Sequence, residues 1–296
     1  LSFSSMSVLS SDSVAGASAA AMGGLRYNRN VKATWKLTPD QRDSIPALYA
    51  SGLSTCAIGQ RLGVHSNSIR SLLARRGIPR RSLSLALARY RCRTDFFRSI
   101  TTERAAYWFG FLAADGCVFV RPHRWVLILQ LAERDRRHVE RLRDDLGSDH
   151  PIRTVLTHGK IHARISIGSR ALCEGLITNG MTPRKSTRLA FPALDADVLH
   201  HYMRGYFDGD GTISATDRPA RAYFSVAGYE PFIRDYQRQL ADACDLGITA
   251  FKRRPDNLVV QLAYTGRHQL LRIYDFLYRD AMTYLARKKE RFALLR

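Results

Sequence analysis

The sequence has few acidic residues for its length and no paired-cysteine motif. Its 296 residues include 46 lysines and arginines but only 26 aspartates and glutamates, which gives a formal net charge of +20 at pH 7. The five scattered cysteines form no CxxC pair, which argues against a disulfide framework or a cysteine-ligated zinc site and fits a reducing compartment. No apolar run is long enough to span a membrane, so we expect no membrane partner.

The N-terminal segment is rich in Ser and Ala and has no lysine or arginine before residue 26. It lacks the basic start of a signal peptide, so residues 1–34 are predicted to form a disordered tail. Basic charge of the size carried by the whole chain favours a polyanionic partner, most commonly nucleic acid. A basic protein without such a partner, and an anionic membrane surface, are the weaker alternatives.

The first folded unit is predicted over residues 35–82, in the stretch TPDQRDSIPALYASGLSTCAIGQRLGVHSNSIRSLLARRGIPRRS. Ser54 should cap a helix over 55–62, Gly63 should make a tight turn, and Ser66 should cap a third helix. Two short helices joined by a glycine turn form a helix-turn-helix, whose second helix presents its N-terminal residues to base edges in the major groove. The expected contacts there are His65, Ser66, Asn67, Ser68 and Arg70.

This stretch resembles the helix-turn-helix of resolvases and invertases through the pattern SxxxIGxxLGVxxxxIxxxLxxxGI. Basic arms beside such modules often lie in the minor groove. The arm candidates here are Arg75, Arg76, Arg80 and Arg81, followed by a basic linker over 83–100. A small helical bundle without DNA contacts is the alternative.

The rest of the chain repeats itself. YWFGFLAADGCV (107–118) and YMRGYFDGDGTI (202–213) align without gaps, and Asp115 matches Asp210. Both runs are predicted helices. Thr101 should cap the first, and the glycines that follow the aspartates should end both as C-terminal glycines.

The segments after each motif follow the same order of elements. Each half is predicted to read helix, strand, strand, helix, strand, strand, helix, over 101–195 and 196–296. Alternation supports the strands, since four apolar residues are expected to share one face of one of them: Ile161, Ala163, Ile165 and Ile167. The predicted fold is therefore α+β, with two pseudo-symmetric αββαββα halves and a small N-terminal all-α domain.

Small residues recur four apart in both motif helices, as Gly110 with Ala114 and as Gly205 with Gly209. This spacing puts them on one helix face and lets two helix backbones approach closely. If the two helices pack there, their C-termini meet and the two motif aspartates stand side by side. A hard divalent cation, Mg²⁺ or Mn²⁺, would then bridge the carboxylates and offset the negative helix ends.

The motifs WFGFLAADG and MRGYFDGDG resemble those of the LAGLIDADG homing endonucleases, and the resemblance covers residues 101–296. It implies that the last acid of each motif, Asp115 and Asp210, binds the catalytic metal, together with Gly116 and Gly211. The sixth motif position holds Ala113 in the first copy and Asp208 in the second, and this position does not usually bind metal in the family.

The resemblance also implies a catalytic lysine near the end of each half. TPRKS and LARKKE match each other and assign Lys185 and Lys288, which would polarise water or stabilise charge on the phosphate; Lys289 adjoins the second. A solvated basic turn is the alternative interpretation of both segments.

In this family the strands form a saddle on DNA, and β-ribbons can read bases in the major groove. The function implied is a site-specific double-strand endonuclease, a monomer that acts as a pseudo-dimer on double-stranded DNA and belongs to a mobile element. A transcription regulator without catalysis and an RNA-binding intron maturase stay open. We expect a cytoplasmic, nucleoid-associated protein of a bacterium or phage host, with an organelle as the alternative. The expected saddle contacts are Arg121, Arg124, Arg153, Arg164, Arg218, Arg221, Lys252, Arg253 and Arg254.

Overall fold

The computed structural model describes residues 37–79, 90–183, 188–214, 222–253 and 258–295. The chain divides into two compact units, Leu1–Arg81 and Ser82–Arg296. The predicted tail over 1–34 and the first part of the predicted linker lie outside the described residues. No helix in the described ranges is long and apolar enough to cross a membrane.

The first unit contains three helices: α1 (Pro39–Ala50), α2 (Thr55–Leu62) and α3 (Ser66–Arg75). Ser54 caps α2 by accepting a hydrogen bond from Ala57 N, and Gly63 ends it at a φ of 69°. The predicted cap of α3 was one residue too late. His65 is the cap, because its Nδ1 accepts from Asn67 N at 3.1 Å.

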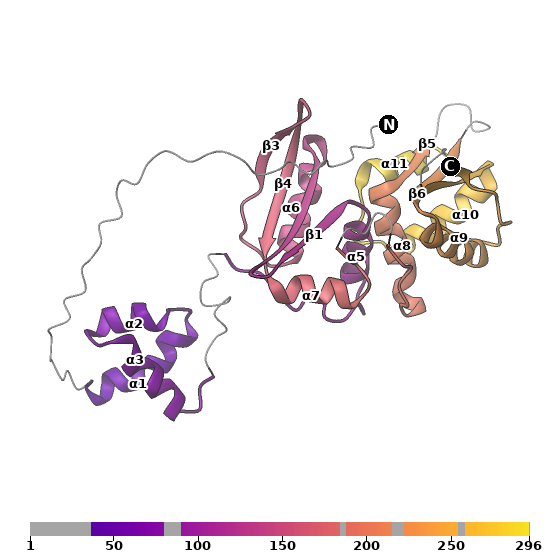
Figure 1. Ribbon diagram of the computed structural model, residues 1–296. Coiled ribbons are helices and arrows are strands. Elements are labelled where there is room, and N and C mark those ends of the chain that lie inside the picture. The colour runs from indigo at the N-terminus through magenta and orange to yellow at the C-terminus, as the bar shows by residue number, and fades with distance from the viewer. Residues whose placement is uncertain (1–36, 80–89, 184–187, 215–221, 254–257, 296) are drawn as a thin grey trace. The chain divides into compact units, whose positions relative to one another are not determined.

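The second unit consists of two halves with the same order of elements (Figure 1). The first half contains α5 (Glu103–Asp115), β1 (Gly116–Arg121), β2 (Arg124–Ala132), the 3₁₀ helix η1 (Glu133–Asp135), α6 (Arg136–Asp145), β3 (Arg153–Thr157), β4 (Lys160–Gly168) and α7 (Arg170–Thr178). The second half contains α8 (Ala196–Asp210), β5 (Gly211–Ser214), β6 (Tyr223–Tyr229), α9 (Glu230–Cys244), β7 (Lys252–Arg253), β8 (Val259–Thr265), α10 (Arg267–Tyr278) and a further helix, α11 (Ala286–Ala293). The predicted αββαββα repeat is confirmed.

Each half forms one antiparallel four-stranded sheet, with strand orders β1-β2-β4-β3 and β5-β6-β8-β7. Helices α6 and α7 pack on one face of the first sheet, and α9 and α10 on the corresponding face of the second. Alternation places Ala163, Ile165 and Ile167 in the core. Ile161 shares this face of β4 but is not buried. It is 55% exposed because it lies near the β3–β4 turn, opposite Leu156, which is also exposed.

Residues 90–100 belong to the second unit, although they were expected in a linker. Phe97 is fully buried, and Asn179 Nδ2 donates to its carbonyl oxygen at 2.9 Å. The apolar side chains of Phe96, Phe97 and Ile100 explain the difference, since they join the main hydrophobic core.

Helices α5 and α8 pack side by side between the two sheets (Figure 1). Their backbones meet at two glycines. A Cβ atom built on Gly110 would lie 2.0 Å from Tyr202 O, and one built on Gly205 would lie 2.0 Å from Tyr107 O. No side chain fits at either position, so the glycines permit an approach that any other residue would block.

Thr102, rather than the predicted Thr101, caps α5 by accepting from Ala105 N at 3.3 Å. The shift by one residue brings Glu103 to the first helical position. There its Oε1 atom accepts from Arg204 Nη2 of α8 at 2.5 Å and from Thr283 N at 2.8 Å. The start of α5 is thereby tied to both α8 and the segment before α11.

We expect Gly205→Ala to lower the free energy of unfolding by about 3 kcal/mol or more, because the added methyl would overlap the main chain of α5. Urea unfolding of the full chain, followed by circular dichroism, measures the effect. Gly247→Ala is the matched control, since a Cβ there meets nothing within 4 Å. Equal stability of the two variants would contradict the close packing of α5 on α8.

His138 of α6 is buried among aromatic rings, and burial lowers its pKa from 6.5 to about 3. Below pH 6.5 His138 therefore binds a proton in the unfolded chain, whereas in the folded chain it stays neutral until the pH approaches 3. The stability contributed by neutral His138 is complete above pH 6.5 and is lost as the pH falls from 6.5 toward 3, by about 1.4 kcal/mol per pH unit.

Between pH 7.5 and 5.5 the wild type should thus lose about 1.4 kcal/mol more than His138→Phe. Each protein is compared with itself at two pH values, so the packing cost of the substitution cancels. Urea titrations at both pH values give the two differences. Equal losses would mean that His138 takes up its proton freely in the folded chain.

Candidate functional site

Asp115 and Asp210 are the last residues of α5 and α8, and both are exposed. Their helices run parallel and end together: a Cβ built on Gly209 would lie 2.3 Å from the Cβ of Ala114 and 3.4 Å from Asp115 Oδ2. The Asp115 carboxylate therefore lies beside Gly209, the residue that precedes Asp210. The structure brings the two motif aspartates to one point on the surface.

The pKa shifts of two neighbouring residues also indicate that the two carboxylates lie close together, because both carboxylates affect each of these residues. The pKa of Tyr206 is raised well above 10, by burial first and then by charges that include Asp210 and Asp115. Burial lowers the pKa of Lys288 to about 8, while the negative charges of Asp208, Asp115 and Asp210 oppose that shift.

Lys288 lies at the C-terminal end of α8. Its Nζ atom donates to three main-chain oxygens, those of Phe207 at 2.7 Å, Asp208 at 2.7 Å and Gly209 at 3.1 Å. A cation at this position offsets the negative end of the helix dipole. The neighbouring Lys289 points elsewhere, with its Nζ 3.9 Å from the centre of the Tyr284 ring. The prediction that Lys288 polarises water is not tested by these contacts, which give it a capping role.

Asp208 is buried beneath this site. Its carboxylate accepts from Tyr107 OH and Tyr278 OH, both at 2.9 Å, and from Leu285 N at 2.7 Å. Burial raises its pKa, and Lys288 and the three donors oppose the rise. Asp208 thus ties α5, α8, α10 and the residue before α11 together, and through Leu285 it fixes the start of the helix that carries Lys288.

Gly116 and Gly211 differ from the prediction for them. They were expected in the left-handed conformation of a C-terminal glycine, but their φ values are −77° and −88°, which lead directly into β1 and β5. Glycine is needed for space. A Cβ would lie 2.7 Å from Leu112 O in the first copy and 2.1 Å from Phe207 Cδ2 in the second.

The carboxylate pair is a sparse metal site as far as protein ligands are concerned. Within the described ranges, no group of three or more His, Cys, Asp or Glu side chains could hold one ion. Mg²⁺ commonly uses only one or two carboxylates and completes its shell with water and substrate phosphates. Two exposed carboxylates beside helix-end carbonyl groups fit that donor chemistry.

The strands carry basic residues and no acidic ones. Across β1 to β8, no described position is Asp or Glu. At the β1–β2 turn the guanidinium groups of Arg121 and Arg124 lie 5.4 and 5.8 Å from the Phe119 ring centre. Arg153 and Arg164 are cross-strand partners on β3 and β4, and Lys252 is exposed on β7. The open face of the first sheet thus suits a polyanion, and the described strands of the second sheet add Lys252.

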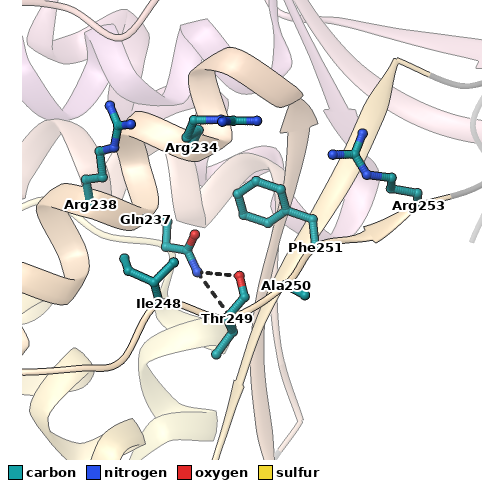
Figure 2. Close-up of a pocket in the computed structure, with 8 residues that line it drawn as sticks. All are labelled: Arg234, Gln237, Arg238, Ile248, Thr249, Ala250, Phe251 and Arg253. Carbon is teal, nitrogen blue, oxygen red and sulfur yellow. Dashed lines mark hydrogen bonds between the residues drawn. The ribbon is translucent and has the colours of Figure 1, made fainter.

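Arg253 is the exception among the predicted contacts. Its side chain pairs with Glu230, with Nη2 donating to Oε1 at 2.7 Å, and Glu230 also pairs with Arg234. Figure 2 shows Arg253 and Arg234 at a cavity of about 380 Å³ beside Phe251. Because its charge is already compensated by α9, Arg253 is a weaker candidate for phosphate than the other strand residues.

The predicted contacts of α3 lie in its first turns. Asn67 and Ser68 are exposed, and Asn67 Oδ1 accepts from Arg70 Nη1 at 3.0 Å. Arg75 and Arg76 are exposed at its other end, where Arg76 pairs with Asp43. Six predicted positions lie outside the described residues: Arg80, Arg81, Lys185, Arg218, Arg221 and Arg254.

Sequence reasoning missed the buried hydrogen-bond network around Asp208 that supports the site. The buried partners of Asp208 are far apart in the chain, and their tyrosines look like ordinary apolar positions of a helix. Arg204 is likewise fully buried on α8, where Nη1 donates to Leu277 O at 3.0 Å. An arginine that interrupts the apolar and aromatic run YMRGYF of α8 was a local signal of such a network.

No protein-family model matches the chain, and a comparison with curated proteins also gives no match. Among solved structures the chain is similar to meganuclease I-SmaMI bound to uncleavable DNA, with 11% identity, a TM-score of 0.45, and coverage of 66% of this chain and 87% of that one. It is similar to the LAGLIDADG meganuclease I-AabMI bound to uncleaved DNA, with 12% identity, a TM-score of 0.43, and coverage of 63% and 87%. It is also similar to the LAGLIDADG homing endonuclease I-GzeII in complex with its DNA target, with 11% identity, a TM-score of 0.44, and coverage of 64% and 87%.

Proposed function

We propose that this chain is a site-specific DNA endonuclease that hydrolyses both strands of a duplex with the help of divalent metal. One observation carries the proposal: two exposed carboxylates, one from each half, end adjacent helices between two sheets whose described strands hold no acidic residue. A structural role alone would not need carboxylates at the negative ends of two parallel helices, where the dipoles disfavour them.

The residues divide the work as follows. Asp115 and Asp210, with the main-chain carbonyls of Gly116 and Gly211, would hold Mg²⁺ or Mn²⁺. When bound, the metal supplies a more acidic water and neutralises phosphate charge. Lys288 holds the end of α8 in place and puts a positive charge near the reacting phosphate. Basic residues of the strands would position the duplex backbone.

The three-helix unit supports a second DNA contact. Its α3 presents exposed polar residues at its N-terminus and arginines at its C-terminus, as a helix that enters the major groove would. We propose that this unit extends the site covered on the DNA. Because the charges are numerous, affinity should fall steeply with salt.

We expect Asp115→Asn and Asp210→Asn each to abolish cleavage while leaving DNA affinity within about threefold, since the positive strands are unchanged. The substrate is a plasmid in which the sequences that flank the gene are joined without it. Wild type with Mg²⁺ should linearise this plasmid and should fail to do so in EDTA. Asp242→Asn, an exposed change on α9, is the matched control.

Persistent cleavage by both aspartate variants would refute the assignment of the site. A wild type that binds the joined site and never cuts it would favour a regulator. Preference for the RNA transcript of the same region over the duplex would favour a maturase.

We expect Lys288→Met to lower the free energy of unfolding by about 3 kcal/mol, because it removes a buried cation from three carbonyl groups and from Asp208. Cleavage should fall at least tenfold at a temperature where the variant is still folded. Lys289→Met is the matched control, because that side chain lies against Tyr284 and makes none of these contacts. Similar behaviour of the two variants would show that Lys288 has no special role.

A further inference from the structure

The two sheets present corresponding rows of side chains beside the helix ends. In the first sheet Gly116 pairs with Leu129, which pairs with Ile165. In the second, Gly211 pairs with Val226, which pairs with Leu262. The next step along each register gives the rows Gln130–Arg164–Arg153 and Ala227–Gln261–Lys252.

These rows lie on the open faces, since the residues on either side of them in β4 and β8 are buried against the helices. The first row lies one register step from Gly116, the first residue of β1, and the second row lies one register step from Gly211, the first residue of β5. They are thus equivalent under the pseudo-symmetry that relates the two halves, and Arg164 corresponds to Gln261.

Arg164 is held in the middle of its sheet. It lies on β4, between β2 and β3, and is half-buried. Its Nε atom is shielded from solvent and finds no acceptor in the described part of the chain. A desolvated donor without an acceptor is costly until a ligand supplies one. By contrast, Arg121 and Arg124 are exposed at a turn and lie against Phe119.

Gln261 is held in the equivalent place on β8 by a neighbour. Its Nε2 atom donates to Ser225 Oγ at 3.0 Å, and Ser225 is itself buried. This bond orients the amide, so that its oxygen and its second N–H are left for another partner. An amide so placed matches the donor and acceptor pair of adenine, whereas a guanidinium matches the two acceptors of guanine.

We propose that Arg164 reads a guanine in one half of the DNA target and that Gln261 reads an adenine at the mirror position of the other half. This assignment rests on the proposed function and adds to it the identity of two bases. The target is therefore not a palindrome at this step, although the two catalytic aspartates are equivalent. Arg153 and Lys252 are exposed beside these residues on β3 and β7 and would contact the phosphate backbone of the DNA.

The test is selection of bound duplexes from a random-sequence pool by the full chain, in EDTA so that the DNA stays uncut. Wild type should select guanine at one position and adenine at its mirror position. Arg164→Gln should change the guanine to adenine, and Gln261→Arg should change the adenine to guanine, each by at least tenfold in preference and only at its own position. Arg164→Lys should keep affinity and weaken the guanine preference.

Arg124→Gln is the matched control, because loss of a backbone contact should lower affinity for all sequences and leave the selected bases unchanged. If the two exchanges leave the selected bases unchanged, or weaken all positions evenly, the base assignment is overturned while the proposed function stands. If wild type selects no preferred sequence at all, the proposed function and the base assignment fail together.

Discussion

The close contact between α5 and α8 is the constraint on which the rest of the second unit depends. Gly110 and Gly205 let the two backbones meet where no side chain would fit, and Gly209 continues the contact to the last turn. Each helix passes directly into the first strand of its sheet, so the crossing also sets the relation between the two sheets. A single steric condition thereby positions two carboxylates and two strand surfaces at once.

The crossing also brings together two negative helix ends and two carboxylates, which is electrostatically unfavourable. Buried residues offset part of this negative charge. Lys288 donates to the main-chain carbonyls at the end of α8, and Asp208 holds the segment that carries Lys288. The outer side is left to Asp115 and Asp210, both exposed. An excess of negative charge at the surface of a protein with a net charge of +20 is a natural place for a divalent cation.

Local patterns predicted the elements of this protein well, because helix and strand periods recur in both halves and small residues mark the helix contact. They predicted fine detail less well. Gly116 and Gly211 were needed for space and not for a left-handed turn. Contacts between distant residues escaped sequence reasoning altogether, since no local pattern shows that Glu230 neutralises Arg253 or that tyrosines from two helices meet on Asp208.

Each half supplies one motif aspartate, whereas the residues at the equivalent positions of the two sheets differ, Arg164 in one and Gln261 in the other. Cutting both strands of a nonpalindromic duplex requires this combination. The central claim is that both aspartates hold the same group of ions over DNA. Anomalous diffraction from crystals of the full chain with duplex DNA and Mn²⁺ tests it most directly. The account predicts Mn²⁺ within coordination distance of both Asp115 and Asp210. Manganese bound elsewhere, or carboxylates too far apart to share it, would contradict the account.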